Sequence, residues 1–399
     1  MITKAYLILE DGTVLEGKSF GAKREVVSEI VFNTSMTGYL EVLTDPSYAG
    51  QAVTMTYPLI GNYGIAKEDM ESGRGWPDGF IVREFARMPS NFRSEDSIEH
   101  FLQENDIPGI YGIDTRALTK ILREKGTMNG MITTDEHYDL DQILPKLREY
   151  RVSGVVKKVS GGFTASADGK LNRSGHVTSA EGSTSTDCQD TSDGCSAIVG
   201  VYRPGDLGSQ SVEVKYQVAV IDVGTKKNII RCLLNRGCEV TVYSCDFDAQ
   251  EVIDSKPDGI MITNGPGDPS ECVDIIAQIR ELADAGIPIF AICLGHQLMA
   301  LAHDAKTYKM KYGHRGVNHP VKNLDTGKVY ISSQNHGYVV DADSLDPAVA
   351  RPWFINVNDQ TIEGLWYLEK PIRTVQFHPE ANAGPKDSEL LFEEFIKML

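Results

Sequence analysis

Long apolar runs and long basic runs are both missing from the sequence, and each absence excludes a class of function. No stretch of about eighteen apolar residues occurs, so we expect no membrane-spanning helix. The formal net charge is −17, and Lys and Arg are scattered. Nucleic acids and anionic membranes are bound through clustered Lys and Arg, so we expect neither as the main partner.

Cysteine is also scarce, and its spacing indicates free thiols. Seven cysteines occur, an odd number, and none form a C-x-x-C pair. A disulfide framework or a zinc site would need paired spacing, so we predict reduced thiols, no metal site and a cytoplasmic location. The first residues, MITKAYLILEDGTVLEG, alternate like a strand and reach Asp11-Gly12 too early for the core of a signal peptide.

The length of the chain favours two domains with a linker between them. The 399 residues are 41% hydrophobic and 24% charged, as in soluble globular proteins, and exceed the usual size of one core. From about residue 161, Ser, Thr, Gly and Asp replace large apolar residues, and such a segment buries too little surface to fold. We predict domains at 1–160 and 215–399, with a flexible linker at 161–214. We expect no role for Cys188 and Cys195 in the linker.

The first half mixes strands and helices. Residues 5–17 are predicted to form two short strands joined at Asp11-Gly12. Residues 113–126 are predicted to form a helix, because they combine an Asp/Thr start, apolar spacing of three and four, a basic last turn and a closing Gly126. This periodicity by itself names no function.

The second half alternates regularly between strands and helices. Strands are predicted at 216–222, 239–244, 258–269 and 287–293, and helices at 226–237, at 273–286 and after Cys293. Such alternation is typical of a parallel sheet covered by helices on both faces, with its site at the carboxyl ends of the strands. Cys293 and the turn NGPGDP both lie at such ends.

Cys293 follows an apolar strand and precedes a helix in FAICLGHQLMALA. A cysteine in this position is often only a small buried residue. However, A-I-C-L-G is close to the G-x-nucleophile-x-G elbow, a strained turn that exposes its central side chain. A helix N-terminus also favours the thiolate form. We therefore interpret Cys293 as a nucleophile.

His378 and Glu380 are the predicted partners of this thiol. They follow the buried strand TVQFHP, and residues two apart in an extended segment project to the same side. Glu380 can then fix the imidazole tautomer while His378 exchanges a proton with Cys293. Taken alone, H-P-E would indicate only the end of a strand with a solvated carboxylate.

The glycine turn offers backbone donors. Gly265 and Gly267 allow N–H groups to approach a ligand closely, and Leu294 N–H is a second candidate donor for an oxyanion. A phosphate cradle is the rival interpretation, but the lysine and hydroxyl of G-x-x-x-x-G-K-[ST] are missing. We expect His314 and His319 to be structural residues of a turn.

Four ordered motifs in the second half, NGPGDP, CLGHQ, SQNHGY and FHPE, resemble the class I glutamine amidotransferase domain over residues 215–399. In the first half, VFNTSMTGYLEVLTDPSYAGQ, TYPLIGNYG and YGIDTRALT resemble the N-terminal domain of the carbamoyl-phosphate synthetase small subunit family. The resemblance implies an α/β fold. Its C-terminal domain would have a mostly parallel sheet flanked by helices, and its N-terminal domain would be mixed α/β.

The resemblance also implies the chemistry. Cys293 would attack the carboxamide of L-glutamine to give a glutamyl thioester and ammonia, with His378 and Glu380 completing a catalytic triad. The glutamine-binding groups of the family correspond to Ser47, Gly265, Gly267, Leu294, Gln297, Asn335, Gly337 and Tyr338. Two positions depart from the usual pattern: Ala291 stands where glycine is frequent, and Tyr338 where phenylalanine is frequent.

The resemblance finally implies a partner. A large synthetase subunit would use the ammonia with bicarbonate, ATP and Mg²⁺ to make carbamoyl phosphate for arginine and pyrimidine synthesis. No cofactor is expected in this chain, which has no Walker-type lysine loop. Amidotransferases that feed GMP synthetase or anthranilate synthase, and γ-glutamyl hydrolases, have no counterpart of this N-terminal half. A non-catalytic interaction subunit is the alternative from another class, but it would not require the triad.

Overall fold

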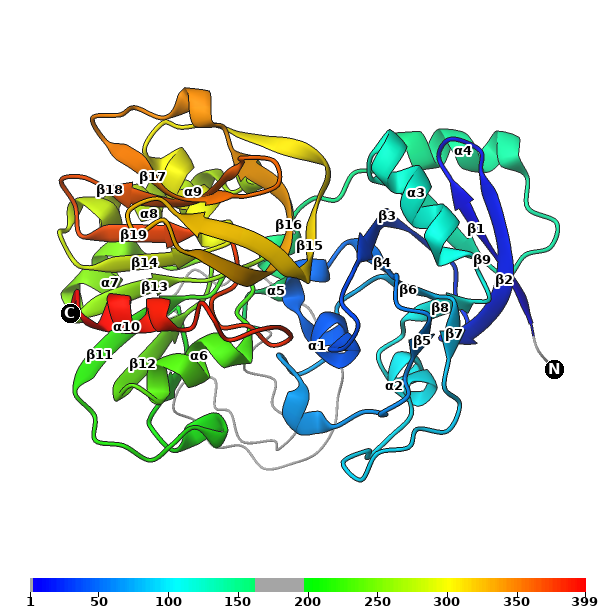
Figure 1. The fold of residues 1–399 in the computed structure, drawn as a ribbon, viewed down its shortest axis with the longest axis horizontal. Helices are drawn as coiled ribbons and strands as arrows, with labels where there is room; N and C mark the ends of the chain where they lie inside the picture. Colours follow the sequence, from blue (N-terminus) through cyan, green and yellow to red (C-terminus); the bar gives the residue numbers. More distant parts are fainter. Residues whose placement is uncertain (1–2, 162–196) are drawn as a thin grey trace, which may run out of the picture.

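The structure is a computed structural model that describes residues 3–161 and 197–399. Two lobes lie side by side (Figure 1): a barrel lobe (residues 4–149, blue to cyan) and a sheet lobe (residues 198–399, green to red). Cys188, Cys195 and most of the predicted linker lie outside the described residues. In the part of the chain that is described, no helix has the length and apolar character needed to cross a membrane.

The barrel lobe is built on seven strands that close on themselves in the order β1-β2-β8-β6-β4-β3-β9. These strands are β1 (Lys4–Leu9), β2 (Val14–Gly21), β3 (Val26–Asn33), β4 (Gln51–Met55), β6 (Gly79–Val82), β8 (Pro108–Tyr111) and β9 (Met128–Thr133). A small separate sheet pairs β5 (Leu59–Ile60) with β7 (Glu84–Phe85). The predicted hairpin is confirmed, because β1 pairs antiparallel with β2 across a turn in which Gly12 has φ 88°.

Helices cover the barrel and connect it to the second lobe. They are α1 (Tyr39–Thr44), α2 (Ile98–Glu104), α3 (Thr115–Lys125), α4 (Leu140–Glu149) and α5 (Val155–Val159). The predicted helix at 113–126 is confirmed as α3: the side chain of Asp114 accepts a hydrogen bond from Ala117 N, and Gly126 ends the helix with φ 105°. In α5, Val156 belongs to the core of the sheet lobe, so this helix joins the two lobes.

The sheet lobe contains a ten-stranded sheet in the order β10-β12-β11-β13-β14-β19-β18-β17-β15-β16. Its strands are β10 (Ile198–Tyr202), β11 (Tyr216–Ile221), β12 (Cys238–Tyr243), β13 (Gly259–Ile262), β14 (Ile289–Ile292), β15 (Thr307–Asn323), β16 (Val329–Val340), β17 (Ala350–Asn356), β18 (Ile362–Tyr367) and β19 (Ile372–Val375). From β12 to β19 in this order the strands run parallel, and from β19 to β16 they run antiparallel. The parallel part agrees with the predicted fold class.

Helices lie on both faces of this sheet, as predicted. They are α6 (Lys227–Leu234), α7 (Ala249–Asp254), α8 (Val273–Asp284), α9 (Leu294–Ala302) and α10 (Leu390–Ile396). Side chains of α7, α8 and α9 belong to one hydrophobic cluster, and side chains of α6 and α10 belong to another. The sheet is therefore sealed between two apolar layers, and the carboxyl ends of its parallel strands are left to form the site.

Three features of the sheet lobe were not predicted. Residues 198–202 form β10, which pairs antiparallel with β12, so the linker prediction for 161–214 is wrong at this point. The run AIVGVY is apolar enough to form an edge strand, but the polar composition of the longer segment masked it. Helix α7 and the antiparallel extension were also missed. In that extension, the long hairpin β15–β16 projects toward the barrel lobe (Figure 1).

Hydrogen bonds join the two lobes around this hairpin and around α6. Backbone Thr127 N donates to Lys311 O at 2.8 Å, and Lys227 N donates to Glu71 O at 2.7 Å. The buried Glu71 side chain also accepts from Asn228 N at 3.1 Å. Glu71 of the barrel lobe thereby binds the first turn of α6, the helix that follows β11.

Candidate active site

Cys293 occupies a strained turn between β14 and α9. Its φ of 54° and ψ of −104° are unusual for a residue with a side chain, as expected for a nucleophile elbow. The turn is anchored by Cys293 N, which donates to Val375 O at 2.8 Å. A Cβ atom at Gly295 would lie 2.5 Å from Ile262 O, so the helix can start this close to β13 only with glycine there. The methyl group of Ala291 is buried in the core, so the departure at this position is accommodated.

Cys293 is 2% exposed, and it lines a cavity of about 460 Å³. Its Sγ lies 3.6 Å from Asn335 O on β16. The thiol is therefore not simply packed into the core, as the alternative interpretation would require. It faces a space large enough for an amino acid.

His378 and Glu380 are buried, and the His378 ring is close enough to Cys293 for the two side chains to interact. His378 Nδ1 lies 2.7 Å from Glu380 Oε1, and His378 N donates to Ser333 O at 2.9 Å. Because Nδ1 faces Glu380, Nε2 is the ring nitrogen left for Cys293. The structure thus brings together the three residues that were predicted from distant parts of the chain.

Charge interactions set the protonation of this group. Burial alone would lower the pKa of His378, but the charges of Glu380 and Cys293 outweigh it and raise that pKa to about 10. Burial alone would raise the pKa of Glu380, but the charges of Lys226 and His378 lower it to about 2. At neutral pH the pair is therefore an imidazolium and a carboxylate.

Lys226 is a partner of the triad that the sequence analysis missed. Its buried Nζ donates to Glu380 Oε1 at 3.0 Å and to Ala381 O at 2.7 Å. Burial opposes its charge, but Glu380 and Glu71 raise the pKa of Lys226 above its usual value. Its position after a parallel strand is the signal in the sequence that could have identified it, because ligands and reactive groups gather at the carboxyl ends of such strands.

The barrel lobe contributes Ser47, as predicted, and also Asp45, which was missed. Ser47 Oγ accepts from Asn264 Nδ2 at 2.9 Å, and Asp45 Oδ2 accepts from Asn335 Nδ2 at 2.9 Å. Asp45 also caps the short helix Pro46–Tyr48 by accepting from Ser47 N at 2.9 Å. The first lobe therefore holds two amides of the second lobe at the wall of the cavity.

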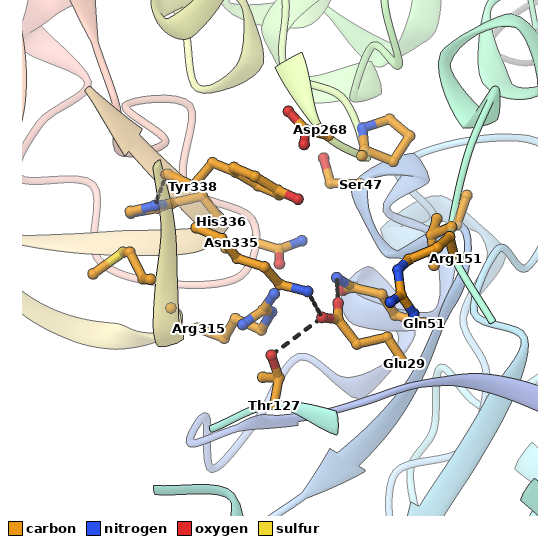
Figure 2. A pocket seen from close by; sticks show the side chains of 18 of the residues that line it. Glu29, Ser47, Gln51, Thr127, Arg151, Asp268, Arg315, Asn335, His336 and Tyr338 are labelled. Carbon is orange, nitrogen blue, oxygen red and sulfur yellow. Dashed lines mark hydrogen bonds and ion pairs between the residues drawn. The ribbon is translucent and has the colours of Figure 1, made fainter. Parts of the chain in front are cut away.

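Seven of the eight predicted glutamine-binding residues line the cavity of Cys293. These are Ser47, Gly265, Gly267, Gln297, Asn335, Gly337 and Tyr338. Figure 2 shows Ser47, Asn335 and Tyr338 around this space. The remaining residue, Leu294, has its side chain in the core. Its predicted contribution is the backbone N–H, which lies in the first turn of α9, where N–H groups have no partner within the helix.

The glycine turn and Gln297 shape the cavity wall. A Cβ atom at Gly265 would lie 2.0 Å from Val223 O, and Gly267 has φ 91°, so both positions favour glycine. Gln297 Nε2 donates to Tyr338 O at 2.8 Å and to Gln376 Oε1 at 2.9 Å. Both amide protons of Gln297 are thus used, and its Oε1 is left as an acceptor.

A charged cluster forms the outer wall, where β3 and β15 meet (Figure 2), and it was not predicted. Glu29 accepts from Gln51 Nε2 at 2.9 Å and from Thr127 Oγ1 at 3.1 Å, and it pairs with Lys309 Nζ at 2.6 Å. Burial opposes the charge of Glu29, but Lys309 and Arg315 lower its pKa. The cluster joins the lobes at the mouth of the cavity.

Comparisons with known proteins agree with both halves of this architecture. Residues 7–132 match the family model for the carbamoyl-phosphate synthase small chain, CPSase domain, and residues 219–398 match that for glutamine amidotransferase class-I. The carbamoyl phosphate synthase small chain of Clostridium perfringens is 46% identical over 99% of this chain and 99% of its own length. This chain belongs to the carbamoyl phosphate synthase small chain family. Within the family, the small chain of Fusobacterium nucleatum is 45% identical over 98% of this chain and 97% of its own length. That of Syntrophotalea carbinolica is 45% identical over 99% and 98%.

Proposed function

We propose that this chain is the glutaminase subunit of a glutamine-hydrolysing carbamoyl-phosphate synthetase. The observation that carries the proposal is the convergence of Cys293, His378 and Glu380 beside a cavity of about 460 Å³ with walls from both lobes. Family membership supports the same function. As the small chain, it would form a cytoplasmic heterodimer with a large synthetase subunit and serve arginine and pyrimidine synthesis.

In the first half-reaction, the thiolate of Cys293 attacks the side-chain carbonyl of L-glutamine. The resulting oxyanion requires N–H donors, which Leu294 and the glycine turn would supply. His378, protonated at neutral pH, then gives its Nε2 proton to the amide nitrogen as the C–N bond breaks. Ammonia leaves, and a glutamyl thioester remains on Cys293.

In the second half-reaction, His378 is neutral and accepts a proton from water as that water attacks the thioester. Collapse of the intermediate breaks the C–S bond, releases glutamate and regenerates the thiolate beside the imidazolium. Glu380, hydrogen-bonded to Nδ1, holds the ring in one orientation through both steps. Lys226 in turn keeps Glu380 ionised.

The cavity suits the ends of a zwitterionic amino acid. Gln297 Oε1 is an acceptor for the ammonium group, and the backbone donors of the glycine turn suit the carboxylate. Tyr338 adds a hydroxyl that points toward Asp268 (Figure 2). Burial, followed by the charge of Asp268, raises the pKa of this phenol, which therefore stays neutral.

Ammonia must then reach a second active site. Protonation would remove its lone pair, so direct transfer to the large subunit is favoured over release into water. A second small cavity, of about 20 Å³, is lined by His378, Lys226 and Ser35 at the junction of the lobes. The large subunit would supply ATP, Mg²⁺ and bicarbonate chemistry, for which this chain carries no Walker-type loop.

The alternative is an interaction subunit that keeps the fold without catalysis. Burying charged side chains costs desolvation energy. A docking scaffold would gain nothing from the buried charges of Lys226, Glu380 and His378, whereas a catalytic subunit uses them. The test uses the complex with the large subunit. We expect Cys293→Ser to abolish carbamoyl phosphate synthesis from glutamine but to leave synthesis from added ammonia intact.

The matched control is Cys272→Ser, which changes another buried thiol and is expected to retain both activities. Glutamine-dependent synthesis by Cys293→Ser would refute the nucleophile. Equal loss with both nitrogen donors would instead indicate a structural role for the thiol and contradict the proposal.

A further inference from the structure

A row of hydrogen-bonded polar side chains, most of them buried, leads to the cavity wall at His336 and includes no residue of the triad. It runs from Asp359 on the surface through His314 on β15 and Glu363 on β18 to Gln334 and His336 on β16. His314 and His319 were expected in a turn, but both lie within β15, so that expectation is corrected. The predicted mechanism uses none of these side chains.

Glu363 is the centre of this row and is 0% exposed. Its Oε1 accepts from Asn356 Nδ2 at 2.8 Å and lies 3.4 Å from His314 Nδ1. His314 Nε2 lies 2.8 Å from Asp359 Oδ2. A carboxylate this deeply buried requires such donors, and His314 supplies a charged one.

The other oxygen of Glu363 sets the orientation of the neighbouring amide. Glu363 Oε2 accepts from Gln334 Nε2 at 2.8 Å, so the amide oxygen of Gln334 faces His336 Nε2, at 2.9 Å. His336 Nδ1 lies 2.8 Å from Tyr338 O, which also accepts from Gln297 Nε2. The carboxylate of Glu363 is therefore connected, through Gln334 and the ring of His336, to Tyr338 and Gln297, two of the predicted glutamine-binding residues. Burial lowers the pKa of His336, so its ring is neutral and donates from one of its two nitrogens.

Metal binding is the other function that such a cluster suggests. Possible ligand atoms of His314, His336 and Glu363 lie within 4.8 Å of one another. However, each ring nitrogen of both histidines already faces an oxygen or amide partner. The side chains of the cluster are thus engaged with one another and with neighbouring groups.

We propose that Glu363 and His314 are positioning residues that act through Gln334 and His336. They hold residues 335–338 and Gln297 in the arrangement that binds glutamine. This inference rests on the proposed glutaminase function. It predicts that disturbing Glu363 weakens glutamine binding more than it slows the chemical step. The reason is that, among the described residues, the side-chain hydrogen bonds of Glu363 and His314 go to other residues than Cys293, His378 and Glu380.

The decisive variant is Glu363→Gln in the complex with the large subunit. An amide at position 363 places an N–H group against one of the donors that the carboxylate accepts, and the orientation of Gln334 is lost. We expect KM for glutamine to rise about tenfold or more, whereas kcat falls less than about twofold. Glu369→Gln, an exposed change just after the same strand, is the matched control and should alter neither.

A swapped variant provides the rescue. Glu363→Gln combined with Gln334→Glu restores a donor–acceptor pair between β18 and β16, and we expect it to recover much of the lost affinity. An unchanged KM in soluble Glu363→Gln, a fall in kcat without a rise in KM, or no rescue by the swap would overturn the inference.

Carbamoyl phosphate synthesis from added ammonia distinguishes a defect in glutamine binding from a general defect in the fold. It should be unaffected in both variants, and its loss would show that Glu363 supports the fold as a whole, which also overturns the inference. If Glu363→Gln does not fold, His314→Gln takes its place with the same expected rise in KM. If the wild-type complex does not use glutamine, or Cys293→Ser still does, the proposed function fails independently of Glu363.

Discussion

Lys226→Met removes the cation beside the triad carboxylate. The Lys226 Nζ–Glu380 Oε1 distance is 3.0 Å, and at an effective dielectric constant of about 20 such a pair gains about 5 kcal/mol of Coulomb energy. Both side chains are nearly fully buried, so little is lost to solvent screening. Removing one partner of a buried pair typically costs about 3–5 kcal/mol. In a protein of 399 residues, where about 1 kcal/mol shifts the unfolding midpoint by about 1.2 °C, we expect that midpoint to fall by about 4–6 °C.

The pH dependence of this loss distinguishes a carboxylate that has lost one of its two cationic partners from a simple packing defect. In the wild-type protein the pKa of Glu380 is depressed to about 2. Its ionised form therefore stabilises the fold above about pH 4.5, and this contribution is lost as the pH falls toward 2. Without Lys226, the buried carboxylate of Glu380 keeps only His378 as a charged partner at neutral pH, so its pKa rises and its protonation relieves part of the cost. The destabilisation should thus be larger at pH 8 than at pH 5.

The assay is urea unfolding of wild type and variant, followed by circular dichroism at both pH values. Lys370→Met is the control, because Lys370 and Asp284 form a partly exposed pair, and its loss should cost less than about 1 kcal/mol. An equal loss for Lys226→Met at pH 5 and pH 8, or a loss no larger than that of Lys370→Met, would refute this account of the buried pair.

Two further predictions concern the elbow and the histidine. Gly295→Ala places a methyl group 2.5 Å from Ile262 O, so we expect about 1–3 kcal/mol of destabilisation by urea unfolding and loss of glutamine hydrolysis. Gly286→Ala is the control for activity: its Cβ meets no atom within 4 Å, and although a φ of 74° strains an alanine there, the variant should keep the activity. The pKa of His378 is raised from 6.5 to about 10, so its contribution to stability is complete below pH 6.5 and is lost as the pH rises through 10. The difference in unfolding free energy between wild type and His378→Gln should therefore shrink steadily between pH 7 and pH 10, and a constant difference would contradict the raised pKa.

The parts of the site that could be predicted from the sequence are those set by local geometry. The elbow at Cys293 follows from small residues around a cysteine between an apolar strand and a helix. His378 and Glu380 meet as predicted, but the extended segment expected for them is wrong: β19 ends at Val375, and a turn in which Ala381 N donates to His378 O at 3.2 Å brings the two side chains together. In each case a few neighbouring residues carry the whole signal.

The residues that were missed depend on contacts between distant segments. Asp45 contacts Asn335 across the two lobes, and DPS by itself indicates only a capped turn. The pairing of Glu363 with His314 and Gln334 depends on the order and register of the antiparallel strands. A shift of one residue in that register would send each side chain to the opposite face, and composition does not fix it.

Glu71 of the barrel lobe binds two segments of the sheet lobe that lie next to Lys226 and Glu380. Its carboxylate accepts from Asn228 N, directly after Lys226 and Lys227, and from Asn382 Nδ2, two residues after Glu380. One side chain of the barrel lobe thus binds both the segment that follows Lys226 and the segment that follows Glu380. The second lobe, cut away from the first, would lose these hydrogen bonds as well as Asp45 and Ser47. If the proposed glutaminase activity holds, it should therefore belong to the joined lobes, and the sheet lobe expressed alone should lack it.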